Sequence, residues 1–122
     1  MTIVAVVLGA ALGAPLRYLL DRLVTDRTSG PDPIHLFPWG LLVVNTLGSA
    51  VAGVVLVATT GDLRLFLLTG FCGAFTTFSG FGWEANRLWV EARQVFWAAA
   101  VLMPVACTLA FLVAWKASGA IT

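Results

Sequence analysis

The sequence predicts an all-α membrane protein with four transmembrane helices, the third of which is broken. Composition is the first observation: 60% of the 122 residues are hydrophobic and 11% are charged, with a mean hydropathy of +0.96. A soluble domain of this size would expose apolar patches large enough to cause aggregation. The apolar residues also fall into four long segments, and glycines, hydroxyls and aromatic side chains interrupt the third.

The four segments lie near residues 3–24, 38–60, 63–88 and 94–117. Each reaches the roughly 20 residues that an α-helix needs to cross about 30 Å of hydrocarbon. We therefore expect a single four-helix transmembrane domain over residues 1–122, with both termini on one side of the membrane.

The first segment carries a charge inside an apolar helix. Its run from Ile3 to Leu20 has no basic flank and is longer than the roughly 7 to 15 residues of a signal-peptide core, so we expect it to remain as a helix. Gly9 and Gly13 have the spacing that lets helix backbones approach closely. Arg17 has two interpretations: its side chain extends to the interface beside Asp21, or it is a buried cation that attracts anions.

The connections between segments are short and polar. Thr25 to Phe37 is expected to be the longest loop, because its glycine, prolines and aspartates break helices and bind water. The lone histidine, His35, is expected to be solvated there. The connections near Gly61 and near Glu91 are too short to house a soluble domain.

The second segment places one amide among apolar residues. Asn45 must find hydrogen-bond partners at membrane depth. It either links helices or faces a water-filled cleft, where its N–H donors could replace part of the hydration shell of a small anion. Gly48 and Ala52 repeat the small-residue spacing of the first segment.

The third segment is the most informative. From Gly70 to Gly82 it contains four glycines, three hydroxyl side chains and four phenylalanines. Such residues favour a broken helix, whose free carbonyls could coordinate a cation or whose free amides could meet an anion. Phe78 and Phe81 share a helical face, and their ring edges carry partial positive charge that suits an anion; the alternative is an ordinary core position.

Tryptophans and cysteines fit the same membrane arrangement. Cys72 and Cys107 lie within apolar runs, without metal-binding spacing, and are expected in the core. Aromatic residues at segment ends mark membrane interfaces. The expected positions are one face for Trp39, Trp89 and Trp97, and the opposite face for Trp115.

The charged residues are few and scattered. A formal net charge of +1 gives no footprint for nucleic acid. The basic residues near the segment ends number four at one face and two at the other: Arg22, Arg27, Arg87 and Arg93 against Arg64 and Lys116. So small a bias permits insertion in both orientations and an antiparallel dimer. Because four helices fill their own centre, a transport role requires at least such a dimer.

Along its whole length the chain resembles the Fluc family of fluoride channels, also called CrcB. The family's first-helix pattern is matched by Gly9, Gly13, Ala14, Arg17 and Tyr18, and its second-helix pattern by Pro38, Gly40, Asn45 and Gly48. Its signature GxxGxxTTFSxF is matched from Gly70 to Phe81. The resemblance implies four-helix chains that assemble as antiparallel dual-topology dimers.

The resemblance also implies which residues form the fluoride pathways, two per dimer. Asn45, Phe78 and Phe81 would line them, with Ser79 and Thr108 as candidates for a polar track beside them.

The resemblance also implies roles for residues at the pore mouth and at a cation site. Glu84 would lie at a pore vestibule, although it could instead be an interfacial residue near Arg87, and Arg17 would attract anions. The backbone carbonyls of Gly73 and Thr76 from both subunits would hold a structural sodium ion on the dimer axis.

Two positions depart from the family pattern. Gly80 and Leu41 stand where the family carries threonine. With two hydroxyl donors missing, the chain could conduct more slowly or less selectively, or could pair with a related chain that supplies them.

The expected function is a passive fluoride channel in the inner cell membrane, through which the anion leaves the cell. No nucleophile or acid–base residue is required, so we do not expect an enzyme. The alternative is a small multidrug exporter, which needs a membrane-embedded carboxylate; the first segment has no acid before Asp21, and Glu84 lies near a helix end. A third possibility is an inert partner subunit of a heteromeric channel.

Overall fold

The computed structural model describes residues 1–119, so the last three residues of the expected domain 1–122 lie outside the described residues. All described secondary structure is helical. In chain order the elements are α1 (Thr2–Thr28), the 3₁₀ turn η1 (Pro33–Leu36), α2 (Trp39–Ala58), α3 (Gly61–Arg64), the π-helix η2 (Leu65–Cys72), α4 (Gly73–Phe75), α5 (Phe78–Glu91) and α6 (Arg93–Gly119).

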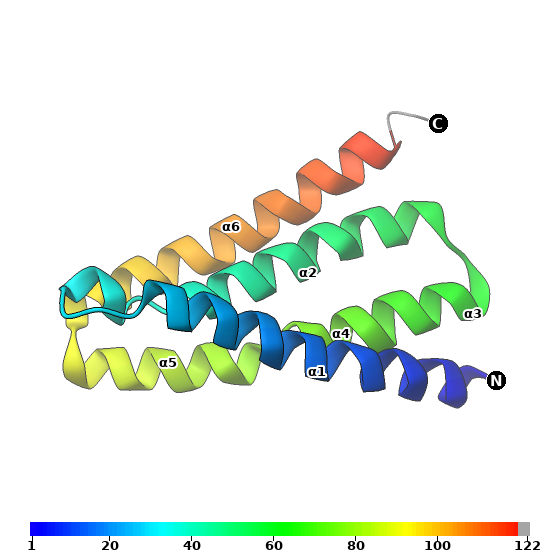
Figure 1. Cartoon of the computed structure of the whole chain (residues 1–122). Helices are drawn as coiled ribbons and strands as arrows, with labels where there is room; N and C mark the ends of the chain where they lie inside the picture. The colour runs from blue at the N-terminus through cyan, green and yellow to red at the C-terminus, as the bar shows by residue number, and fades with distance from the viewer. Residues whose placement is uncertain (120–122) are drawn as a thin grey trace.

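These elements form four spans long and apolar enough to cross a membrane, which confirms the four predicted segments. The third span comprises α3, η2, α4 and α5, which follow one another along the bundle (Figure 1). The start of α1 and the end of α6 lie at the same end of the bundle, as an even number of spans requires (Figure 1).

The third span is broken at two residues, as predicted. Thr76 and Thr77 have extended backbones, with φ −82° and ψ 160°, and φ −150° and ψ 120°. The π-helix before the break widens the turn, a distortion often found at functional sites. The break lies at mid-depth of the bundle and separates α3, η2 and α4 from α5 (Figure 1).

The loop predicted from Thr25 to Phe37 begins later than expected. α1 continues to Thr28, because hydroxyl groups satisfy its last carbonyls: Thr28 Oγ1 donates to Val24 O at 2.8 Å and Ser29 Oγ donates to Thr25 O at 2.6 Å. The remaining loop contains η1.

His35, which was expected to be solvated, lies in this loop and is only partly exposed. The side chain is half-buried, and its Nδ1 hydrogen-bonds the carbonyl of Thr28. Because a carbonyl only accepts, Nδ1 carries the proton of this bond. His35 therefore ties η1 to the end of α1.

Glycines bring α1 against the third span. A Cβ atom built on Gly9 would lie 2.1 Å from Phe66 O, and one built on Gly13 would lie 2.4 Å from Phe71 O. On the opposite helix, a Cβ on Gly70 would lie 2.6 Å from Val6 O. The expected close approach of small residues is confirmed, and its partner is η2.

The second pair of small residues has two different neighbourhoods. A Cβ atom on Gly48 would lie 2.3 Å from Thr76 Cγ2, so this glycine lets α2 contact the break. Ala52 instead lies in the wall of an open hollow.

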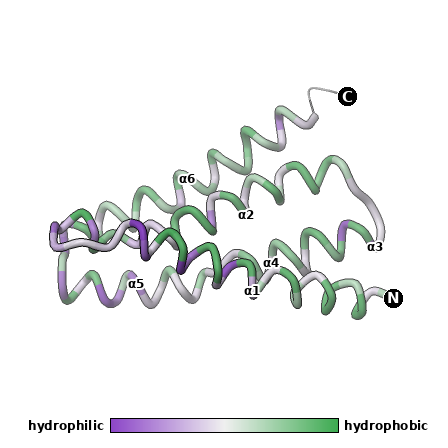
Figure 2. The backbone as a smooth tube through the Cα atoms, viewed as in Figure 1, coloured by the Kyte–Doolittle hydropathy of each residue, from purple (hydrophilic) through white to green (hydrophobic). Residues whose placement is uncertain are grey.

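Most of the outer surface is apolar, as a lipid-facing surface requires. Large side chains such as Leu12, Val101 and Leu109 are 54%, 61% and 56% exposed. Hydrophilic positions gather towards the end of the bundle that holds η1 and along α5 (Figure 2). Trp39, Trp89 and Trp97 lie at that end, at the ends of α2, α5 and α6. The arrangement matches the predicted aromatic belt.

The core that positions the site lies where α2, α5 and α6 meet. It consists of five buried residues: Phe37, Leu41, Leu88, Ala99 and Met103. Phe81 packs against this core and is thereby held on the inner side of α5. Cys72 is 4% exposed, which confirms its expected core position.

Candidate functional site

Asn45 pairs with the backbone at the break. Its Nδ2 donates to Thr77 O at 3.1 Å, and its Oδ1 accepts from Thr77 N at 2.8 Å. Both polar groups of an unwound residue are thus satisfied by one amide from α2. The second Nδ2 hydrogen has no partner within residues 1–119 and remains available as a donor. Asn45 therefore links helices and can also serve an anion.

Thr77 begins α5 as its N-cap. Its Oγ1 accepts from Gly80 N at 3.0 Å and lies 3.1 Å from Ser79 Oγ. Thr76 is the C-cap of α4, and its N and Oγ1 both donate to Cys72 O at 2.9 Å. The helical pattern stops at the next residue, because Thr77 N donates to Asn45 Oδ1 and not to Gly73 O.

A hollow of about 300 Å³ opens beside this break, and we call it the phenylalanine hollow. Phe78 and Phe81 line it with ring centroids 6.0 Å apart, which confirms that they share one helical face. Phe78 is 85% exposed, so the hollow is open on one side of a single chain. Its other lining residues are Asn45, Ser49, Thr76, Thr77, Met103, Pro104 and Cys107.

Five residues of this hollow were not among the predicted site residues: Ser49, Thr77, Met103, Pro104 and Cys107. Ser49 lies one helical turn after Asn45, so the spacing of four residues could have identified it. Cys107 was expected in the core, but it is half-buried in the wall of the hollow, with Sγ 4.0 Å from Thr46 Oγ1. The apolar run around Cys107 gave no signal of this position.

A second hollow, of about 430 Å³, adjoins the first, and we call it the glycine hollow. It contains Gly73, Thr76 and Thr108, and it shares Ser49, Thr76 and Cys107 with the phenylalanine hollow. Within residues 1–119 no cluster of three or more His, Cys, Asp or Glu could hold a metal ion. The groups in the glycine hollow that could coordinate a cation are backbone carbonyls and side-chain hydroxyls.

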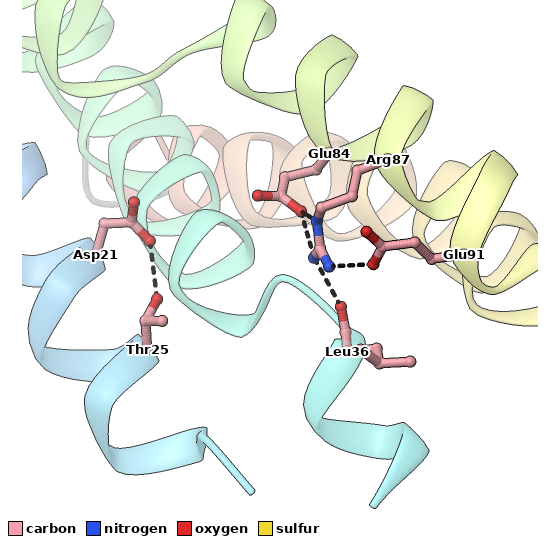
Figure 3. Close-up of polar contacts among 6 residues, drawn as sticks. All are labelled: Asp21, Thr25, Leu36, Glu84, Arg87 and Glu91. Carbon is pink, nitrogen blue, oxygen red and sulfur yellow. Dashed lines mark hydrogen bonds and ion pairs between the residues drawn. The ribbon is translucent and has the colours of Figure 1, made fainter. Parts of the chain in front are cut away.

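A third hollow, of about 390 Å³, lies near the loop end of the bundle, and we call it the polar hollow. Arg17, Asp21, Glu84 and Arg87 line it. Arg17 Nε is buried and has no hydrogen-bond partner in the described part of the chain. Asp21 instead accepts from Thr25 Oγ1 at 3.4 Å (Figure 3). Within residues 1–119 Arg17 therefore lines the polar hollow without a hydrogen bond to Asp21.

Glu84 both lines the polar hollow and forms an ion pair. Arg87 Nη2 lies 2.6 Å from Glu84 Oε2, and Arg87 Nη1 lies 3.1 Å from Glu91 Oε2 (Figure 3). Arg87 also donates to Leu36 O at 3.2 Å, which fixes α5 to η1 (Figure 3). Arg87 therefore compensates the negative charge of Glu84 in the wall of the polar hollow.

The break connects the predicted site residues. Thr77 lines both the polar hollow, which contains Arg17, and the phenylalanine hollow, which contains Asn45. Thr108 lies in the glycine hollow beyond. Ser79 is exposed and lies outside all three hollows, although its hydroxyl contacts that of Thr77.

Residues 4–117 match the family profile described as CrcB-like protein, Camphor Resistance (CrcB). The match covers the four spans and the break.

Three curated relatives illustrate the similarity. The fluoride-specific ion channel FluC 1 of Nocardia farcinica is 44% identical over 89% of this chain and 74% of its own length. The fluoride-specific ion channel FluC of Rhodospirillum rubrum is 40% identical over 89% and 88%. The protein of the same name from Paramagnetospirillum magneticum is 36% identical over 94% and 91%.

Proposed function

The chain belongs to the CrcB-like family, and from this premise we propose that it is a passive channel selective for fluoride. The observation that carries the proposal is the combination of this membership with a broken third span, where an amide donor and two phenylalanine rings line one hollow. Donors and ring edges suit an anion, whereas a cation site would require oxygen ligands.

In the proposed pathway, fluoride first enters the polar hollow. Arg17 lines this hollow and offers positive charge there. The anion then passes Thr77 and meets the second N–H of Asn45 and the edges of Phe81 and Phe78. Fixed donors replace its hydration shell, and narrowness excludes larger halides.

The direction of flow follows from acid–base chemistry. Hydrogen fluoride crosses membranes and ionises in the more alkaline cell interior, so a passive channel in the inner cell membrane exports the trapped anion. No proton-exchanging carboxylate is needed. Glu84 is engaged by Arg87, which argues against the small multidrug exporter as an alternative.

The proposed assembly is an antiparallel dual-topology homodimer with two pores. Phe78 and Thr108 are exposed on a single chain, so both hollows need a cover that a second copy can provide. The basic residues at the two ends differ by only two, which allows both orientations.

Labelling can test the orientation. With a cysteine introduced at Thr2, a membrane-impermeant thiol reagent should modify about half of the molecules in intact vesicles, because half of the chains would face each way. The unmodified chain gives the background from Cys72 and Cys107. Complete labelling, or none until detergent is added, would contradict dual topology.

A structural sodium ion on the dimer axis is part of the proposal, and the break supports it. In an intact helix, Gly73 O and Thr76 O would accept from Thr77 N and Gly80 N, four residues on. These donors are diverted, since Thr77 N bonds to Asn45 Oδ1 and Gly80 N bonds to Thr77 Oγ1. The two carbonyls are therefore free for a hard cation, and Gly73 lies exposed where a second copy could add its own pair.

Efflux from liposomes tests the function. Protein made from this chain alone should release fluoride quickly, as followed by a fluoride electrode, with little chloride release. Release of both ions would contradict the proposed selectivity for fluoride over chloride. Folded protein that releases neither would favour an inert partner subunit, a possibility that the two missing threonines support.

Phe81 should contribute through its ring edge. The substitution Phe81→Ile keeps bulk in the phenylalanine hollow but removes this edge, so fluoride throughput should fall about three- to tenfold while the dimer stays assembled. Phe96→Ile is the matched control, since Phe96 packs between Trp89 and Trp97 and lies outside the hollows. Equal throughput in both variants would return Phe81 to a core role.

A further inference from the structure

The two positions that lack the expected threonines lie side by side. Leu41 comes from α2 and Gly80 from α5, and both line the polar hollow. A Cβ atom built on Gly80 would lie 3.2 Å from Leu41 Cδ1, closer than side chains normally pack. Leu41 is 7% exposed, so its side chain has little room to move away. The leucine thus occupies space that a larger residue 80 would need.

Thr77 closes the other side of this small space. The same Cβ atom would lie 2.8 Å from Thr77 Cγ2. Thr77 cannot rotate without losing the N-cap bond to Gly80 N, and Asn45 holds its backbone. Because Thr77 is held, residue 80 can relieve this contact only by shifting its own backbone, and Leu41 Cδ1, the flexible end of a side chain, is the other atom that limits such a shift. Residues 41 and 80 are therefore expected to change together.

Leu41 also lies close to the residue that the two hollows of the proposed pathway share, since a Cβ atom on Gly80 would contact both Leu41 Cδ1 and Thr77 Cγ2. The polar hollow and the phenylalanine hollow share Thr77 as their common lining residue. Leu41 lines the first and belongs to the core against which Phe81 packs. An apolar side chain at this junction offers no hydrogen bond to a small anion, and apolar constrictions restrict ions by excluding water.

We propose that Leu41 and Gly80 are a matched pair that closes the inner end of the polar hollow and limits the rate of fluoride passage towards Asn45 and Phe81. Gly80 lets the leucine reach across, and the leucine removes a donor from the route. This inference rests on the proposed function, and it makes Leu41 a rate-determining residue of this chain.

Flux through a leucine-to-threonine variant tests the rate. Leu41→Thr supplies a hydroxyl at the junction, and one added hydrogen bond of about 1 kcal/mol should raise fluoride efflux about three- to tenfold. Leu47→Thr is the matched control, because Leu47 lies on the same helix but is 48% exposed and outside the hollows. A folded Leu41→Thr variant with the parental rate, or a slower one, would overturn the proposal.

Stability of a double variant tests the pairing independently of fluoride. Gly80→Thr should lower the thermal unfolding midpoint in the parental background, and the loss should shrink by at least half when Leu41→Thr is present. Equal losses in both backgrounds would overturn the pairing. If the parental chain released no fluoride, the proposed function would fail, whereas the coupling between the two positions would still be measured.

Discussion

Replacement of Asn45 by aspartate should abolish fluoride flux. The carboxylate would place a negative charge where the anion has to pass, and it would lose the donor that now bonds Thr77 O at 3.1 Å. Two like charges 4 Å apart repel by about 4 kcal/mol at an effective dielectric of 20, so a loss of at least roughly 100-fold is expected. Fluoride efflux from liposomes measures it.

The control variant for the negative charge introduced at residue 45 is Asn86→Asp. Asn86 lies on α5, is exposed and lines none of the three hollows, so the same chemical change there should leave efflux within about twofold. Size-exclusion chromatography of both variants reports assembly. Undiminished flux through Asn45→Asp would remove Asn45 from the pathway and leave it only its structural bonds to the break.

The sequence predicted the features that depend on local composition. Four apolar segments and a break within the stretch from Gly70 to Gly82 follow from hydropathy and from residues that compete with helical hydrogen bonds. The shared face of Phe78 and Phe81 follows from helical spacing alone. These properties need no knowledge of which helices are neighbours.

Features that depend on distant partners could not be predicted. Asn45 had two open interpretations because its partner, Thr77, lies 32 residues away. Likewise, Leu41 and Gly80 were two separate departures until the fold placed them in contact. The end of α1 was misplaced because hydroxyls of Thr28 and Ser29 continue a helix that composition alone would end. In each case a tertiary or side-chain hydrogen bond decides the outcome.

The close contact between α1 and η2 shows how strongly such a partner constrains the sequence. At Gly70 an added methyl group would lie 2.6 Å from Val6 O and 3.0 Å from Gly9 Cα. Both atoms belong to the backbone, so no flexible side chain can move aside. The helices would have to separate, and the break that η2 supports would move with them.

Gly70→Ala should therefore prevent correct folding. The test of this variant is its folding, not its fluoride flux. Overpacking of this kind costs about 1 to 3 kcal/mol and occasionally more, enough to lower the thermal unfolding midpoint and the monodisperse fraction sharply. Gly82→Ala is the matched control, because a Cβ on Gly82 meets no atom within 4 Å and alanine favours helix. If both variants unfold alike, the contact between α1 and the third span is looser than this geometry requires, and the small residues Gly9 and Gly13 lose their role in bringing the two spans together.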